Sequence, residues 1–153
     1  MNNFAYPATL TPDPESGGFV IIFRYLPEAI TQGEDLSDAL EQAADCLEEA
    51  IAGRISDNEV IPQPSSAQKE EYLIHLPAQT AIKAALYNTM RSTPLTKLEL
   101  AKRLNCDETE IDCLLDPHQA SKWPSIENAL QALGHQVVID IIPLTRTTRL
   151  EYR

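Results

Sequence analysis

Five carboxylates at helical spacing are the side chains in this sequence whose types and positions best indicate a functional surface, a negatively charged face of one helix. At about 100° per residue they fall within roughly a third of a helix circumference. No Lys or Arg lies between them, so like charges three or four residues apart repel one another. The stretch is therefore either a solvated helix face or a surface for a positively charged partner. The five residues are Asp38, Glu41, Asp45, Glu48 and Glu49.

The sequence gives little support for catalysis. His75, His118 and His135 have no evident catalytic partner, and the chain has neither a phosphate-binding glycine loop nor a nucleophile elbow. Cys106 and Cys113, even taken together with His118, lack the short ligand spacing of a zinc site. We therefore expect a protein that is not an enzyme and that holds no metal ion and no cofactor.

The stretch from Pro94 to Gly134 carries a second pattern: two short helices, a tight turn between them and a third helix. Thr96 can cap the first helix, Asn105 can adopt the left-handed conformation that ends it, and Asp107 or Thr109 can cap the second. This pattern is typical of a helix-turn-helix, whose second helix enters the DNA major groove. A plain three-helix bundle fits the spacing equally well. The apolar positions of the two short helices are Leu95, Leu98, Leu100, Ala101, Leu104, Ile111, Leu114 and Leu115.

The charge of the chain is uneven. The formal net charge of -11 repels a polyanion at long range. Up to Leu76 the chain has 14 acidic and three basic residues, whereas from Pro77 onward it has nine of each. This asymmetry predicts two modules, residues 1–76 and residues 77–153, that bind different partners. No apolar run reaches the roughly 18 residues of a membrane span and the N-terminus lacks signal-peptide features, so we expect a cytoplasmic protein.

The first half reads as a small α+β unit. Turn residues separate its strands, and the apolar residues of its one long helix recur at three-and-four spacing, so the helix can pack on the sheet. Leu26 to Ala29 is expected to break the second strand from the third. The elements are strands Phe4–Leu10, Phe19–Tyr25, Ala29–Gly33 and Tyr72–Leu76, and a helix from Leu36 to about Arg54.

The second half reads as helical with one terminal strand. A helix from about Ala78 to Arg91, with Ala81, Ile82, Ala85, Leu86 and Met90 inside, precedes the helix-turn-helix pattern, and Ser125 is expected to cap the helix that ends at Gly134. The strand from Gln136 to Leu144 is alone in its half and needs a mate. We expect the same strand of a second copy, giving a two-fold dimer through Val137, Ile139 and Ile141; the alternative is that it joins the N-terminal sheet.

Fragments in both halves stand in a joint order that is fairly specific, although each fragment alone is common. The first-half fragment runs from Tyr6 to Ile51, with Gly18, Pro27 and Thr31-Gln32-Gly33 before the Ala-rich helix. The second-half fragments are LTKLELAKRL (Leu95–Leu104), LLDPHQASK (Leu114–Lys122) and ALQALGHQVVIDI (Ala129–Ile141). In this order the chain resembles the HicB antitoxins of bacterial HicAB toxin–antitoxin systems.

The resemblance implies a partial RNase H-like first domain without nuclease activity. That domain would bind a small, basic, mRNA-cleaving HicA-type toxin through the five carboxylates. The second domain would form a homodimer or a dimer of dimers, bind operator DNA and repress its own operon.

The second short helix of the pattern, which would be the recognition helix, departs from what DNA binding favours. Its stretch Asp107–Asp112 is acidic and includes no Arg or Lys. Carboxylates can accept hydrogen bonds from cytosine but repel phosphates. We therefore expect weak, salt-sensitive operator binding by one module, made useful by oligomers. The residues expected at the DNA are Thr96, Lys97, Lys102, Arg103, Asp107, Glu108, Thr109, Asp112, Ser121 and Lys122.

Two other functions stay open on the sequence. One is a stand-alone dimeric transcriptional regulator whose acidic N-terminal domain senses another protein or a ligand. The other, with the least support, is a nuclease that uses the carboxylates of the first domain. A small basic reading frame beside the gene would favour the antitoxin.

Overall fold

The computed structural model describes residues 4–144, which divide into two compact units. Residues 4–51, 62–77 and 141–144 belong to the first unit, and residues 52–61 and 78–140 belong to the second. Each unit is therefore assembled from separate stretches of chain, and the last residues of one long helix belong to the second unit. The division into domains 1–76 and 77–153 stays a prediction.

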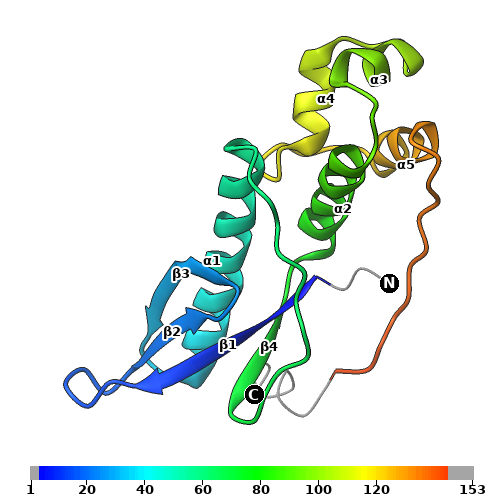
Figure 1. Ribbon diagram of the computed structural model, residues 1–153. Helices are drawn as coiled ribbons and strands as arrows, with labels where there is room; N and C mark the ends of the chain where they lie inside the picture. The colour runs from blue at the N-terminus through cyan, green and yellow to red at the C-terminus, as the bar shows by residue number, and fades with distance from the viewer. Residues whose placement is uncertain (1–3, 145–153) are drawn as a thin grey trace. The chain divides into compact units, whose positions relative to one another are not determined.

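The first unit is a four-stranded sheet with one long helix, α1 (Leu36–Ser56), across one of its faces (Figure 1). The strands are β1 (Ala5–Pro12), β2 (Phe19–Phe23), β3 (Leu26–Gly33) and β4 (Glu71–His75). They lie in the order β3-β2-β1-β4, and every neighbouring pair is antiparallel. The expected mixed α+β class is thus confirmed.

The break between the second and third strands was expected at Leu26–Ala29, and that position is wrong, because the turn lies at Arg24 and Tyr25. β3 begins at Leu26, whose side chain is fully buried and whose backbone pairs with Phe23 after an irregularity in the β2–β3 register. Pro27 is tolerated inside this strand because β3 is an edge of the sheet, where a missing N–H leaves no ladder bond unmade.

The helix approaches the sheet closely at Gly33. A Cβ atom at this position would lie 2.4 Å from the Cα atom and 2.5 Å from the backbone nitrogen of Ala39 on α1. Only glycine leaves room for that contact. The α1 residues that face the sheet side are buried: Ala39, Leu40, Ala43, Leu47 and Ile51.

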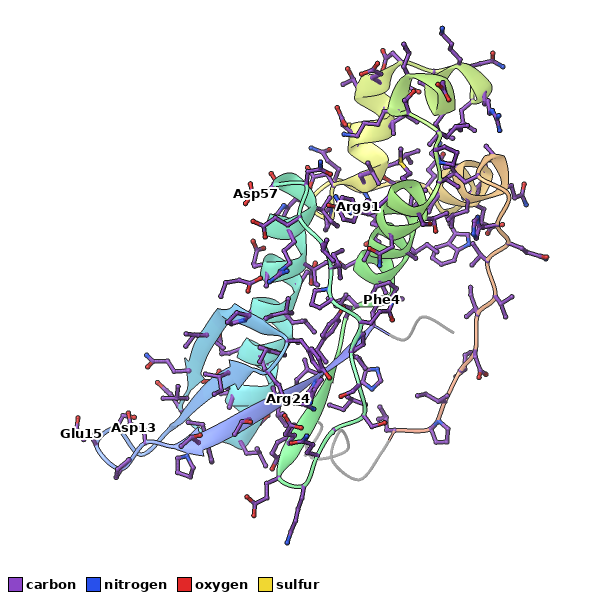
Figure 2. The ribbon with its side chains drawn as sticks, viewed as in Figure 1. Phe4, Asp13, Glu15, Arg24, Asp57 and Arg91 are labelled. Carbon is purple, nitrogen blue, oxygen red and sulfur yellow. The ribbon has the colours of Figure 1, made fainter. Side chains whose placement is uncertain are left out.

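The second unit is helical. It holds α2 (Ala78–Ser92), α3 (Lys97–Arg103), α4 (Glu108–Leu115) and α5 (Trp123–Ala132). Its core includes Leu86, Leu100, Ile111 and Ile126, all almost fully buried. Arg91 of α2, labelled in Figure 2, donates to the backbone oxygen of Asn58 at 2.9 Å, and Tyr87 donates to that of Glu59 at 2.6 Å. These bonds hold residues 57–61 against α2 within the unit.

The local signals around the two short helices are confirmed. The Thr96 hydroxyl accepts a hydrogen bond from the Glu99 backbone N–H at 3.2 Å, and the Asp107 carboxylate accepts one from that of Glu110 at 3.0 Å. Asn105 has φ +55°, the left-handed conformation expected of it. Leu98 was expected inside, but it is 49% exposed.

Two other expectations for the second half are wrong. The last helix begins at Trp123 rather than after Ser125, because Pro124 fixes a helical φ in its first turn. In α2 the expected buried face was Ala81, Ile82, Ala85, Leu86 and Met90. The buried residues are instead Thr80, Lys83, Ala84, Leu86 and Tyr87, so only Leu86 is common to both sets. The stretch Gln136–Leu144 forms no strand in the single chain and, within residues 4–144, pairs with no strand of the sheet, so the alternative of joining the N-terminal sheet is wrong, whereas its pairing with a second copy stays a prediction.

Candidate functional sites

The predicted acidic surface lies on α1, away from the residues that this helix buries. Glu41, Asp45 and Glu49 are exposed, whereas Asp38 and Glu48 are half-buried. Because the buried side of the helix is fixed against the sheet, the exposed carboxylates are held along one rigid surface. Such a surface can bind a positively charged partner without first becoming ordered.

Asp38 has a local role. Its carboxylate accepts a hydrogen bond from the Glu34 backbone N–H at 2.8 Å, while its own N–H donates to the Asp35 carboxylate at 2.8 Å. This reciprocal pair caps the N-terminus of α1, where negative charge is also favoured by the helix dipole. Asp38 therefore contributes to the start of the helix as well as to its negative charge.

The two short helices are joined by an ion pair between two residues that were both expected at DNA. The Lys97 Nζ atom lies 2.7 Å from an Asp112 carboxylate oxygen, and both side chains are about half exposed. Thr96 and Asp107 are engaged as caps, while Glu108 and Thr109 are exposed in and beside the first turn of α4.

The remaining predicted basic residues are Arg103, which forms a hydrogen bond within the unit, and two exposed lysines. Arg103 donates from Nη1 to the backbone oxygen of Ala132 at 3.1 Å, which ties α3 to the end of α5. Lys102 on α3 and Lys122 at the start of α5 are exposed. They are accordingly the best placed of the predicted residues to meet a phosphate.

Ser121 belongs to a buried contact that the sequence did not indicate. Its hydroxyl accepts a hydrogen bond from Lys83 Nζ at 2.9 Å. The same ammonium donates to the backbone oxygens of Cys113, Asp116 and Gln119 at 3.0, 2.7 and 2.6 Å. Burial lowers the pKa of Lys83, and the Asp116 carboxylate opposes that shift. Only the tertiary fold brings these acceptors together, so no sequence spacing could have revealed them.

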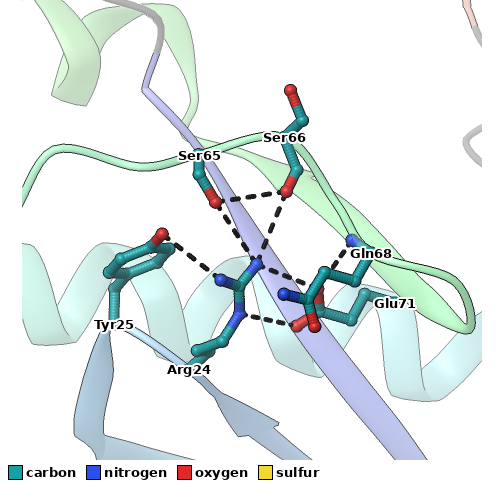
Figure 3. A network of polar contacts seen from close by, with 6 residues as sticks. All are labelled: Arg24, Tyr25, Ser65, Ser66, Gln68 and Glu71. Atoms are coloured by element: carbon teal, nitrogen blue, oxygen red, sulfur yellow. Dashed lines mark hydrogen bonds and ion pairs between the residues drawn. The ribbon is translucent and has the colours of Figure 1, made fainter.

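The sequence also did not indicate a network of polar contacts around Arg24 in the first unit (Figure 3). The Arg24 guanidinium forms a two-point ion pair with Glu71, with Nε–Oε2 and Nη2–Oε1 distances of 3.1 and 3.0 Å. Its Nη2 also donates to the Ser65 hydroxyl at 3.3 Å and to the Ser66 backbone oxygen at 3.4 Å, and its Cζ atom lies 4.9 Å from the centre of the Tyr25 ring. The network fixes the segment before β4 to the sheet.

The C-terminal residues expected in a dimer are accessible. Ile139 and Ile141 are 66% and 91% exposed, and Val137 is half-buried. Val138, Ile142 and Leu144 are also exposed. An apolar stretch of this length in water indicates a surface that another chain can cover.

Two searches of the described residues set limits on other functions. Residues 4–144 contain no group of three or more His, Cys, Asp or Glu residues placed to hold a metal ion. Within the same range no helix is both long and apolar enough to cross a membrane.

Comparison with known proteins gives a consistent result. Residues 5–85 match a family described as the HicB-like antitoxin of bacterial toxin–antitoxin systems. The chain is 38% identical to the antitoxin HicB of Escherichia coli K12 over 137 residues, which cover 90% of this chain and 99% of that protein. It is 33% identical to the antitoxin HicB 1 of Photorhabdus laumondii over 141 residues, 92% of this chain and 89% of that protein.

Proposed function

The chain belongs to the HicB family of antitoxins of bacterial toxin–antitoxin systems, and from this premise we propose that it neutralises a HicA-type, mRNA-cleaving toxin and represses its own operon. It acts by binding rather than by catalysis, and it does so in the cytoplasm, where both mRNA and operator DNA are accessible.

The observation that carries the proposal is the acidic surface of α1. A toxin that cleaves RNA must present positive charge to the phosphate backbone. Glu41, Asp45 and Glu49 offer carboxylates to that same positive surface, so an antitoxin bound there excludes the RNA. The net charge of the whole chain, -11, also accelerates encounter with a basic partner.

The fold of the first unit supports this role. The sheet order β3-β2-β1-β4 with one long helix is compatible with the partial RNase H-like fold that the family resemblance implies. Capping by Asp35 and Asp38 and close packing at Gly33 hold α1 rigid. Binding then costs little conformational entropy.

In the second unit we propose that α3 and α4 act as a helix-turn-helix, with α4 entering the major groove. Lys102 and Lys122 anchor phosphates, and the acidic side chains of α4 accept hydrogen bonds from cytosine amino groups. Each module contributes few cations, so the binding is weak, and because it depends on phosphate contacts it weakens as the salt concentration rises.

Two copies pair through Gln136–Leu144 and thereby present two helix-turn-helix modules. When this stretch pairs as a β-strand, its alternate residues Val137, Ile139 and Ile141 lie on one side. A two-fold dimer, or a dimer of dimers, matches the symmetry of a palindromic operator.

Co-expression with the small basic reading frame adjoining the gene tests the proposal. We expect a stoichiometric complex by mass determination, growth rescue of cells that express the toxin, and a band shift of DNA from the upstream region. If no partner co-purifies and the neighbouring product is harmless, the toxin-neutralising role fails and a stand-alone regulator becomes the better account.

A further inference from the structure

Within residues 4–144 Lys83 is the only charged residue in the buried core, with 0% of its surface exposed. It comes from α2, yet all four of its hydrogen-bond acceptors belong to the end of α4 and to the connection between α4 and α5. One ammonium group therefore joins α2 to a stretch of the second unit that begins 30 residues further along the chain.

The hydrogen-bond partners at this site favour the charged form of the lysine. An ammonium has three N–H donors and no acceptor, and here it is surrounded by three backbone oxygens and one hydroxyl. Only the Ser121 hydroxyl could donate to the lone pair of a neutral amine, which would leave two N–H groups for three backbone oxygens. The acceptors lie 2.6–3.0 Å from Nζ, the range of well-formed charge-assisted hydrogen bonds.

The position of the ammonium is suited to α4. Cys113, whose backbone oxygen it binds, lies in the last turn of this helix, where the carbonyl groups are unsatisfied and the dipole is negative. α4 has acidic residues in its first turn and no basic residue in its last turn. Lys83 supplies from α2 the cation that α4 itself lacks.

The other ties of α4 and α5 are weaker. The Lys97–Asp112 pair and the bond from Arg103 to Ala132 are both exposed, so water and salt compete with them. The Lys83 contacts are screened far less because the side chain is buried. The direction of α4 and the path of residues 116–121 consequently depend on Lys83 more than on any exposed contact of these helices.

We propose that Lys83 is a positioning residue for operator binding, because its ammonium fixes the end of α4 and the α4–α5 connection in the arrangement that DNA requires. This inference rests on the proposed DNA-binding function. Lys83 touches no DNA itself; it sets where α4 and Lys122 meet the duplex.

The full chain with Lys83→Met tests the inference, with Lys69→Met as the matched control. Both variants lose one lysine charge, but Lys69 is an exposed residue of the first unit. For Lys83→Met we expect operator affinity to fall by about tenfold or more, with helical circular dichroism and toxin binding retained. Hydrogen exchange of residues 116–121 should accelerate while α3 stays protected. Operator affinity within about twofold of the control would overturn the inference.

A second variant covers the case in which Lys83→Met does not fold. Lys83→Arg keeps a buried cation, but its planar guanidinium cannot reproduce a compact ammonium, so the connection must shift. We expect intermediate operator affinity in the folded variant, and unchanged affinity would again overturn the inference. If the wild-type chain binds no upstream DNA at all, the proposed repressor function fails, which is distinguishable from a failure confined to Lys83.

Discussion

The Lys97 ammonium lies 2.7 Å from a carboxylate oxygen of Asp112, so that α3 and α4 are joined by two residues of opposite charge. Both residues were predicted to face DNA. The pair has almost no net charge. Asp112 reduces the attraction of Lys97 for a phosphate, and Lys97 reduces the repulsion between Asp112 and a phosphate. This pair therefore reduces both the attraction and the repulsion that the proposed helix-turn-helix would exert on DNA.

Replacing Asp112 with Asn should strengthen operator binding. The change releases Lys97 and removes one negative charge from α4, so we expect affinity to rise about three- to tenfold and the salt dependence to steepen by about one phosphate contact. Titrations of the upstream DNA at several salt concentrations measure both. Glu127→Gln on α5 removes the same charge without releasing Lys97 and serves as the control. Weaker binding by Asp112→Asn would show that the carboxylate itself reads a base.

Ile139→Asp should dissociate the dimer. The 66% exposed Ile139 side chain is proposed to be covered by a second copy, and covering two unpaired carboxylates instead is unfavourable. We expect the dimer dissociation constant to rise about a hundredfold or more, measured by sedimentation equilibrium. Asp140→Asn, on the alternate side of the same stretch, should leave the dimer intact. A dimeric Ile139→Asp chain would place the interface elsewhere.

Gly33→Ala should destabilise the first unit by about 3 kcal/mol, at the upper end of overpacking effects. Its new methyl group would meet backbone atoms of Ala39 at 2.4–2.5 Å, and backbone atoms cannot rotate away. Gly53→Ala is the matched control, because nothing lies within 4 Å of its added Cβ and the position is exposed on α1. That variant should gain about 0.5–1 kcal/mol of helix propensity. Urea unfolding of both variants checks the contrast, and equal effects would refute the close contact.

Glu71 should contribute to the acid sensitivity of the fold. Burial raises the pKa of this carboxyl. The hydrogen bonds that it accepts from Arg24 and from the Gln68 backbone N–H together lower the pKa by more, so the net pKa is below its ordinary value. A group with a lowered folded-state pKa stabilises the fold above its unfolded pKa, and that contribution disappears as the pH falls through the folded-state pKa.

Glu71→Gln should therefore lower the melting temperature at pH 7 and flatten its decline toward acid. Thermal unfolding between pH 7 and pH 3 measures this, with Glu70→Gln as the neighbouring exposed control. If the wild-type and Glu71→Gln curves decline in parallel, the Arg24–Glu71 pair does not account for the acid sensitivity.

The features that the sequence predicted correctly are those decided by a few neighbouring residues. Thr96 and Asp107 cap their helices because a side-chain oxygen satisfies an N–H three residues on, and Asn105 adopts a positive φ that few other residues tolerate. The strands and the long helix followed from apolar periodicity. Family membership followed from fragments whose joint order is specific although each is common.

The features that the sequence could not predict depend on tertiary neighbours. Pro27 was expected to break the chain because the sequence does not say which strand forms the edge of a sheet. A lysine such as Lys83 is normally assigned to the surface, and its acceptors lie 30–38 residues away along the chain. The Lys97–Asp112 pair joins two residues 15 positions apart that were assigned separately to DNA.

Inhibition of the toxin's RNA cleavage by the purified chain tests the central claim most directly. The variants are the full chain with Glu41→Lys and Asp45→Lys on α1, and a control with Glu15→Lys. Glu15 is exposed in the turn between β1 and β2, where Figure 2 shows it beside Asp13 at the tip of the connection. All three single variants change the net charge equally.

We expect the wild-type chain and Glu15→Lys to stop cleavage at a stoichiometric ratio. Glu41→Lys and Asp45→Lys should each need about tenfold or more antitoxin, because each places a cation against the positive surface of the toxin. If both α1 variants inhibit as well as Glu15→Lys does, the toxin binds elsewhere and the acidic surface of α1 is only a solvated helix face.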